Sequence, residues 1–440
     1  MRAASLRPLA GGMRPAAAKG IFMDSKSSSN LNEKELQTLK NLECPDSTAW
    51  TMQPPLVLSK AKGSYLFDAE NKSYIDMIAG FGSLPLGHAS GPYKKVLEKA
   101  LKEDKMVQGL GDLFPSTDKI AFLKLLIETL PAPYEQASLA LSGSQAVEGA
   151  LKTAMLYTGR SGFISFEKGY HGVDLGALMV TSNPYFKTRF KKILKEEASI
   201  KLPIGCAMED FKKAARALQK NGHGLAGAIL EPIQGRAGIL PADEKWLMDL
   251  KEEIRKEGGL LILDEIFTGL GRTGQLLASP TGADILLLGK ALGGGLPLSA
   301  FAASKKVMAA WPTCEGEALH TGTFFGHPLA CQTGLETLKV LREEVFLSEV
   351  REKGIEALDI LKASLRGNKA VKEVRGRGLF MGIAFVDAGY GVKACDVLRE
   401  NGIVALPSGE SGKVLSLTPA LNIDRKLLGE VCRKIGLLLS

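Results

Sequence analysis

LLILDEIFTGLGRTG (residues 260–274) and DILLLGKALGGGLPLSA (residues 284–300) each contain a short, unbroken apolar run near the start. Runs of this length and composition predict parallel strands that are buried on both faces of a sheet. The first run ends at Asp264 and the second ends just before Lys290. Because ligand chemistry in open α/β sheets lies at the carboxyl ends of the strands, these two charged side chains are predicted to face one site.

Similar apolar runs alternate with helical patterns through the middle of the chain. The seven predicted strands are Ser138–Leu141, Gly162–Phe166, Ala177–Thr181, Ala226–Leu230, Leu260–Leu263, Ile285–Leu288 and Ser299–Ala302. Amphipathic stretches between them, such as Ala146–Leu156 and Lys245–Lys256, predict helices. The alternation predicts an α/β fold in which a mainly parallel, seven-stranded sheet carries helices on both faces.

The pattern changes after Pro328, which marks a predicted domain boundary. Two helical patterns, Leu329–Arg342 and Leu347–Ser364, are followed by the strand-like run LFMGIAFV. This order predicts a smaller α+β C-terminal domain over residues 329–440, after a large domain over residues 81–328.

The N-terminal part of the chain is predicted to lie outside the large domain. Residues 1–50 read as a partly disordered extension with a surface helix over residues 32–43. GSYLFDAENKSYIDM predicts a hairpin that turns at Glu70–Asn71. The segment 51–80 that contains it is predicted to pack with the small domain.

The net charge and the lengths of the apolar runs argue against nucleic-acid and membrane partners. The net charge is +8, and Arg2, Arg7, Arg14 and Lys19 supply four of those charges. The rest of the chain is only mildly basic, so no nucleic-acid partner is predicted. No apolar run reaches the roughly 18 residues that a bilayer span requires, so no membrane partner is predicted either.

The cysteines and residues 1–23 give indications of the cellular compartment. The six cysteines have no CxxC spacing, which predicts a reduced, cytoplasmic environment without disulfides or a zinc site. Residues 1–23 are rich in Arg and Ala and contain no acid, as in a transit peptide, which would place the protein in an organelle matrix. The alternatives are a disordered extension, or an upstream start with Met13 or Met23 as the initiator.

Lys290 is the most informative residue of the sequence. It interrupts an apolar strand and precedes three glycines and a proline. Burial disfavours the ammonium form of a lysine and leaves a nucleophilic amine that is suited to Schiff-base formation. Alone, such a lysine is more often structural and Asp264 could be a capping or loop residue, but their combination favours a catalytic site.

Two loops supply candidate contacts for a planar, phosphorylated ligand. Ser142 and Gln145 form the S-x-x-Q pattern of a capping box, and small residues at a helix N-terminus expose N–H groups to an anion. In SFEKGYHG, Tyr170 could stack on a ring. Taken separately, these are an ordinary N-cap and a loop aromatic. With Asp264 and Lys290 they match pyridoxal 5′-phosphate, and the acid would keep the pyridine nitrogen protonated.

Over residues 50–430 the sequence resembles the class III (ω-amino acid) aminotransferases of fold type I. The resemblance rests on LILDEIFTGLGRTG and LLLGKALGGGLPLSA, and on EPIQG, YHG, HTGTFFGHPLA and VRGRGLFMGI in the same order. It implies a pyridoxal-phosphate enzyme that transfers an amino group from an amine donor to an oxo-acid acceptor. It also implies an obligate homodimer with shared active sites.

The resemblance assigns roles to individual residues. Lys290 would form the Schiff base and shuttle the proton, and Asp264 would pair with the pyridinium. The other residues assigned to the cofactor are Gly143 and Ser144 at the phosphate, Tyr170 and His171 at the ring, and Thr323 at the phosphate of the neighbouring subunit. Glu231 is expected on the substrate side.

Four positions depart from the family pattern. Ser416 stands where many members carry a carboxylate-binding arginine, and Val173 where some carry an arginine after His-Gly. QGRAG replaces QGEGG, so Arg236 stands in place of a gating glutamate. Phe267 replaces a frequent glutamine. We hypothesise that Arg236 has taken over carboxylate recognition, the alternative being a solvated loop arginine.

Parts of the sequence also match other functions. Within the fold, an aminomutase of the glutamate-1-semialdehyde type would need no separate oxo acceptor. GLGRTG (Gly269–Gly274) matches a dinucleotide-binding pattern, but Pro280 and Gly282 follow too closely for the required helix. The histidines lack metal-ligand spacing, so no metal is predicted. The basic stretch Lys187–Lys195 could attract an acidic partner and is predicted to be a solvated loop or helix face, partly balanced by nearby glutamates.

Overall fold

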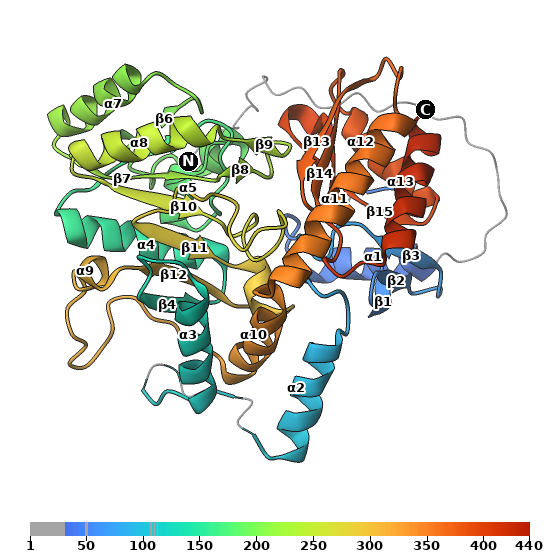
Figure 1. The fold of residues 1–440 in the computed structure, drawn as a ribbon, viewed down its shortest axis with the longest axis horizontal. Coiled ribbons are helices and arrows are strands. Elements are labelled where there is room, and N and C mark those ends of the chain that lie inside the picture. Colours follow the sequence, from blue (N-terminus) through green and yellow to red (C-terminus); the bar gives the residue numbers. More distant parts are fainter. Residues whose placement is uncertain (1–30, 49–51, 106–107, 110, 112) are drawn as a thin grey trace, which may run out of the picture.

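A computed structural model describes residues 31–48, 52–105, 108–109, 111 and 113–440. The proposed transit segment, residues 1–23, lies outside these ranges. Figure 1 shows a large domain around one sheet, and a second group of strands and helices formed by the C-terminal part of the chain.

The central sheet has seven strands in the order β4-β12-β11-β10-β7-β5-β6. β12 runs antiparallel to both of its neighbours and the other pairs are parallel, which confirms the predicted mainly parallel sheet. In chain order the strands are β4 (Gln136–Ala140), β5 (Gly162–Phe166), β6 (Ser199–Leu202), β7 (Leu225–Leu230), β10 (Leu260–Asp264), β11 (Ile285–Leu288) and β12 (Ser299–Ala303).

Helices cover both faces because alternate side chains of each strand point to opposite sides. In β10, Leu261 and Leu263 join one buried cluster, with residues of α7 (Met208–Lys220) and α8 (Glu244–Lys256). Ile262 joins another, with residues of α4 (Gly143–Thr158). The carboxyl end of β10, and with it Asp264, is thereby fixed between two packed layers.

One predicted strand is wrong. Residues 177–181 were expected to be extended, but they lie largely in the helix α5 (Leu175–Val180). A short apolar run of this kind is compatible with either a buried strand or a buried helix segment. The seventh strand is instead β6, whose sequence SIKL was not recognised because it contains a lysine.

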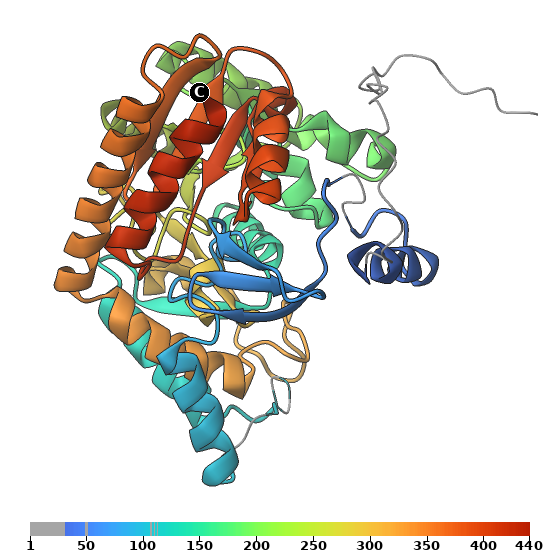
Figure 2. The ribbon, with the colours of Figure 1, turned by 90° about the vertical axis from the view of Figure 1, so that its right-hand side faces the viewer.

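The C-terminal part forms a second sheet, in the order β13-β14-β17-β16. Its strands are β13 (Val371–Arg377), β14 (Phe380–Phe385), β16 (Leu406–Ser408) and β17 (Val414–Leu417). The helices α11 (Glu344–Ser364), α12 (Tyr390–Glu400) and α13 (Arg425–Leu439) accompany it, as Figures 1 and 2 show. This is the smaller α+β unit that the sequence predicts.

The N-terminal segment pairs with the C-terminal part of the chain. β1 (Leu58–Lys62), β2 (Tyr65–Asp68) and β3 (Ser73–Asp76) form an antiparallel meander, and β3 pairs in parallel with β15 (Ile403–Val404). The hairpin turns at Asn71, whose φ of 65° lies in the left-handed region that asparagine tolerates. The exact domain boundaries stay a prediction.

Shorter elements complete the described chain. The other helices are α1 (Leu31–Leu42), α2 (Gly91–Lys102), α3 (Thr117–Thr129), α6 (Pro184–Lys187), α9 (Lys305–Met308) and α10 (Pro328–Leu341). The short 3₁₀ turns are η1 (Thr188–Phe190), η2 (Glu196–Ala198), η3 (Lys290–Gly293) and η4 (Glu410–Gly412). A two-stranded ribbon consists of β8 (Ile233–Gln234) and β9 (Leu240–Pro241).

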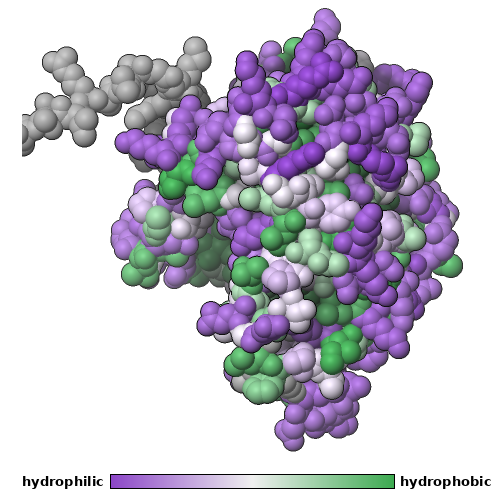
Figure 3. All heavy atoms as spheres, turned by 90° about the vertical axis from the view of Figure 1, so that its left-hand side faces the viewer, coloured by the Kyte–Doolittle hydropathy of each residue, from purple (hydrophilic) through white to green (hydrophobic). Residues whose placement is uncertain are grey.

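Because the apolar side chains are packed between the layers, the outer surface is expected to be mostly polar. The face in Figure 3 is mostly hydrophilic, with separate hydrophobic patches between polar areas. Among the described residues, the helices are all too short or too polar to cross a membrane.

Candidate active site

Lys290 lies just beyond the carboxyl end of β11, where Gly289 leads into the turn η3. Its φ of 42° is positive, which is costly for a residue other than glycine and common at functional sites. The Nζ atom lies 4.2 Å from the centre of the Phe267 ring. Although the residue as a whole is only partly shielded from solvent, burial of the amine lowers the pKa of Lys290, while Asp264 and Glu231 oppose that shift.

Asp264 ends β10 and faces His171. Its Oδ2 lies 2.7 Å from His171 Nδ1, and its Oδ1 accepts a hydrogen bond of 3.1 Å from the Ile266 N–H. Both side chains are buried. Since an ionised carboxylate can only accept, His171 carries its proton on Nδ1. His171 Nε2 is buried and finds no partner among the described residues.

Asp264 and Glu265 are adjacent in the sequence but have different roles. Glu265 accepts hydrogen bonds from the Thr268 hydroxyl at 2.6 Å and from the N–H groups of Ala278 and Ser279, both at 3.0 Å. It therefore holds the loop after β10 in place. The GLGRTG stretch lies in this loop as turns, without the helix that dinucleotide binding requires.

Glu231 follows β7 and lies on the same side as Asp264. Its carboxylate accepts hydrogen bonds from the N–H groups of Tyr170 and Gly235, both at 3.0 Å. Burial raises its pKa to about 7, and the nearby charge of Asp264 adds to the shift. Glu231 thus fixes the loop that carries Tyr170 and can exchange a proton near neutral pH.

The N-terminus of α4 adjoins Lys290. The Ser142 side chain accepts from the Gln145 N–H at 3.2 Å, which is one half of the predicted capping box. Gln145 Oε1 accepts from the N–H of Leu141 at 3.1 Å and not from that of Ser142, so the reciprocal bond is displaced by one residue. A Cβ on Gly143 would lie 2.9 Å from Ile266 and one on Gly289 would lie 3.1 Å from it. Ile266 therefore brings the helix N-terminus and the Lys290 segment together.

Ser144 joins this helix end to the loop with His171. Its Oγ accepts a hydrogen bond of 2.9 Å from the Asp174 N–H. Gly172 has a φ of 113°, and a Cβ there would lie 2.4 Å from Ser144 Oγ, so only glycine permits this approach. The predicted Gly143, Ser144 and His171 contacts therefore lie on adjoining segments.

Arg236 lies over aromatic side chains. Its guanidinium carbon is 4.5 Å from the centre of the Tyr170 ring and 5.5 Å from that of Phe186. Arg236 is exposed and makes no ion pair with a described carboxylate. Phe186 could not be predicted from the sequence. NPYFK contains two aromatic residues, and nothing in it indicates which one faces Arg236.

Two of the three other departures, Phe267 and Ser416, line the same region with uncharged groups. The Phe267 ring packs 4.7 Å from that of Phe380, centre to centre. Ser416 is buried on β17 and its hydroxyl bonds that of Ser408. The Ser408–Gly409 segment adjoins the Arg236 loop, because the Gly409 N–H donates to the Arg236 carbonyl at 2.9 Å.

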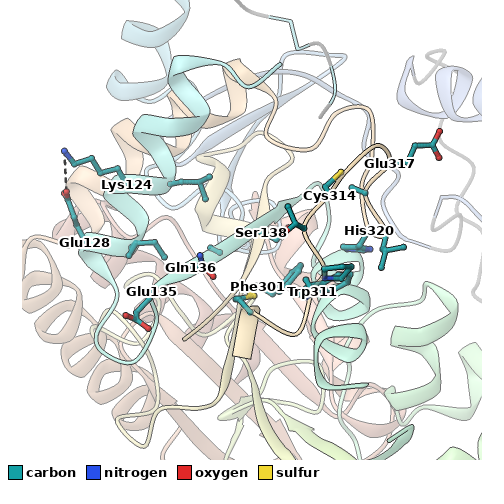
Figure 4. Close-up of a pocket in the computed structure, with 18 residues that line it drawn as sticks. Lys124, Glu128, Glu135, Gln136, Ser138, Phe301, Trp311, Cys314, Glu317 and His320 are labelled. Carbon is teal, nitrogen blue, oxygen red and sulfur yellow. Dashed lines mark ion pairs between the residues drawn. The ribbon is translucent and has the colours of Figure 1, made fainter. Parts of the chain in front are cut away.

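Thr323 lies apart from these residues within the chain. It is exposed and lines a small cavity with Lys119 and His327. A larger cavity of about 740 Å³ lies between α3, the edge strand β4 and the segment before Thr323. Figure 4 shows Phe301, Trp311 and His320 in its wall. Neither Lys290 nor Asp264 lines it, so this cavity is separate from the candidate site.

The residues present fit pyridoxal 5′-phosphate. Lys290 Nζ makes no hydrogen bond to a described residue. The Gly143 and Ser144 N–H groups at the start of α4 likewise donate to no described residue, so they can bind an anion as helix ends do. Asp264 is held by His171, which suits a carboxylate that must stay ionised beside a pyridinium. With the seven-stranded sheet, these features define a pyridoxal-phosphate-dependent transferase.

The chain belongs to the class III aminotransferases. The sequence model described as Aminotransferase class-III matches residues 47–439. The protein is therefore a pyridoxal-phosphate-dependent transaminase, as its motifs indicate.

Curated relatives share about a third of the sequence. The chain is 33% identical to the acetylornithine aminotransferase of Methanothermobacter thermautotrophicus, over 88% of this chain and 94% of that protein. It is 34% identical to the [LysW]-aminoadipate semialdehyde/glutamate semialdehyde transaminase of Sulfolobus acidocaldarius, over 81% and 88%. It is 31% identical to the diaminobutyrate–2-oxoglutarate aminotransferase of Haemophilus influenzae, over 86% and 89%.

Solved structures match the whole fold. The ornithine aminotransferase of Toxoplasma gondii superposes with a TM-score of 0.80 at 27% identity, covering 92% of this chain and 95% of that one. The similarity confirms the predicted α/β sheet with a smaller C-terminal domain.

Proposed function

We propose that this transaminase moves the terminal amine of an amino acid or a diamine to a 2-oxo acid, and that Arg236 binds a substrate carboxylate. The observation that supports this most is the Arg236 guanidinium, which pairs with no described carboxylate and lies over two aromatic rings beside the site. The relatives named for acetylornithine and diaminobutyrate support the donor class.

The chain's own residues would divide the work as follows. Bound pyridoxal phosphate supplies a carbonyl carbon that takes the donor nitrogen and a ring that accepts electrons. Lys290 Nζ, whose pKa is lowered by burial, would carry the proton to and from the reacting carbon. Asp264, oriented by His171, would hold the ring nitrogen in its protonated form, and Gly143 and Ser144 would hold the phosphate.

Arg236 and Glu231 are the charged residues that we assign to the substrate side. Phe267 and Ser416 offer no cation to a carboxylate next to the reacting amine. A donor whose amine is separated from its carboxylate by a hydrocarbon chain matches this distribution, because the chain can lie against Phe267 while the carboxylate reaches Arg236.

Arg236→Ala provides the test of carboxylate binding. Loss of a hydrogen bond to a charged group costs about 1.5–3 kcal/mol, so the KM for 2-oxoglutarate should rise roughly 10- to 100-fold with a smaller change in kcat. Arg216→Ala, which removes another exposed arginine, is the matched control. An unchanged KM in Arg236→Ala would show that Arg236 is an ordinary surface arginine.

A half-reaction screen tests the donor class. Single amines are added to the holoenzyme, namely ornithine, 4-aminobutyrate, diamines, glutamate and alanine, and the cofactor absorbance is followed. Conversion by donors with a terminal amine supports the proposal, whereas conversion by alanine alone contradicts it. Turnover of one substrate without any oxo acceptor would instead identify an aminomutase.

A further inference from the structure

Two lysines outside the active site share one acceptor. Lys187 ends α6 and Lys201 lies on β6, and their Nζ atoms donate to the same Met179 carbonyl at 3.3 Å and 3.2 Å. Lys187 is only 5% exposed, so the prediction that the stretch from Lys187 is solvated is wrong at its first residue. The hydrocarbon part of the Lys187 side chain is buried next to α5.

The charges around this pair are poorly balanced. Glu196 Oε1 lies 3.8 Å from Lys187 Nζ, and within the described ranges Lys201 has no carboxylate within ion-pair distance. The pKa of Lys201 is lowered to about 7, first by burial and then by the hydrogen bond and charge of Lys187, while Glu196 opposes the shift. A lysine next to another cation is the arrangement that yields a neutral, nucleophilic amine in water.

A third polar residue lies next to Lys201 in the sheet. Ser165 on β5 is the register partner of Lys201 on β6, so both side chains point to the face of the sheet that α5 covers. The Ser165 hydroxyl is fully buried, and no hydrogen-bond partner for its Oγ occurs in the described part of the chain. A buried hydroxyl without a partner is costly and points to a group that completes the site.

We propose that Lys201 is a site of carbamate formation with carbon dioxide. The Nζ lone pair bonds to the carbon of CO₂, one C=O double bond becomes a C–O⁻ bond, and one amine proton leaves to solvent. No oxidant or second reactant is needed. The product is a carboxylate placed between the Lys187 ammonium and the Ser165 hydroxyl.

The carbamate would correct both the poorly balanced charge of the lysine pair and the missing hydrogen-bond partner of Ser165. It places a negative charge beside the Lys187 ammonium, and its oxygens offer an acceptor to Ser165. Lys201 rather than Lys187 is assigned because Lys201 keeps part of its surface open to solvent, whereas Lys187 is buried and engaged by Glu196.

The experiment uses the full-length holoenzyme in buffer with ¹³C-labelled bicarbonate. Carbamates are trapped with a trialkyloxonium reagent and located by peptide mass spectrometry. The expected result is a labelled ester on Lys201, absent in Lys201→Arg and retained in Lys192→Arg, a control on an exposed lysine. Lys187→Gln should reduce the label several-fold, because it removes the cation, and Ser165→Ala should reduce it less.

Each outcome bears on the proposal once melting temperatures show that the variants are folded. No label on Lys201, or labelling no stronger than on exposed lysines, overturns it. Full labelling in Lys187→Gln also overturns it, since the proposed product depends on the Lys187 ammonium. A label on Lys187 with Lys201 free contradicts the assignment to Lys201.

Discussion

At the scale of single residues, His171 is a positioning residue for Asp264. Its Nδ1 atom lies 2.7 Å from Asp264 Oδ2 in the protein interior. Asp264, and not His171, is the group that would face the cofactor. His171→Ala should lower kcat roughly 10- to 100-fold, the equivalent of a lost hydrogen bond to a charge, with little change in KM. Steady-state kinetics measure both constants.

His171→Asn separates positioning from a purely structural role. The asparagine amide can still donate to Asp264, so this variant should recover part of the lost kcat. If Asn and Ala reduce kcat equally while both variants melt like the wild type, the hydrogen bond to Asp264 does not matter for turnover.

Glu231 makes the stability depend on pH. Its pKa is about 7 in the folded protein against 4.5 for the free group, so the folded state keeps a proton that the unfolded state releases. The free energy of unfolding should therefore fall as pH rises from 4.5 to 7, by at most roughly 3 kcal/mol from this residue. Urea unfolding of wild type and Glu231→Gln at pH 5 and pH 8 measures the difference. Equal pH slopes for the two proteins would contradict the assignment.

At the scale of elements, α4 supplies the cap that α5 lacks. The N-cap residue of α5, Asp174, makes no side-chain capping bond. Glu148 on α4 accepts instead from the N–H groups of Gly176 at 2.6 Å and Ala177 at 3.1 Å. One side chain thus joins the helix at the proposed phosphate site to the helix beside the lysine pair.

Glu148→Ala should cost about 0.5–2 kcal/mol of stability, as for the loss of other helix caps. Glu148→Gln keeps an acceptor oxygen and should cost less. Urea unfolding curves measure both variants. The capping role is refuted if Ala and Gln unfold at the same urea concentration as the wild type.

The buried strands and the longer amphipathic helices were predictable from sequence, whereas the lysine-containing strand β6 and the short helix α5 were not. β5 and β11 have the predicted bounds because all their residues are buried between helices. α5 was mistaken for a strand because its six residues are too few to show a helical period. At the site, Asp264 and Lys290 were predictable from their places at strand ends. Phe186 was not, because its contact with Arg236 depends on how two distant loops fold.

At the scale of the whole molecule, the exposure of Thr323 leads us to propose shared active sites. Thr323→Ala should weaken cofactor binding roughly tenfold if its hydroxyl reaches the phosphate of a partner subunit. Mixing that variant with Lys290→Ala should restore activity, because one site of each mixed dimer has an intact Lys290 and an intact Thr323. If the mixture has only the average activity of the Thr323→Ala and Lys290→Ala proteins, each chain uses its own Thr323.

The pairing of β3 with β15 has a consequence for how the protein is made. Ile75 emerges from the ribosome long before its partner Ile403 has been translated. The edge strand β4 likewise waits for β12, its neighbour in the central sheet. During synthesis both early strands present unpaired edges, so a chain that stalls before β15 should be held by chaperones or aggregate rather than assemble.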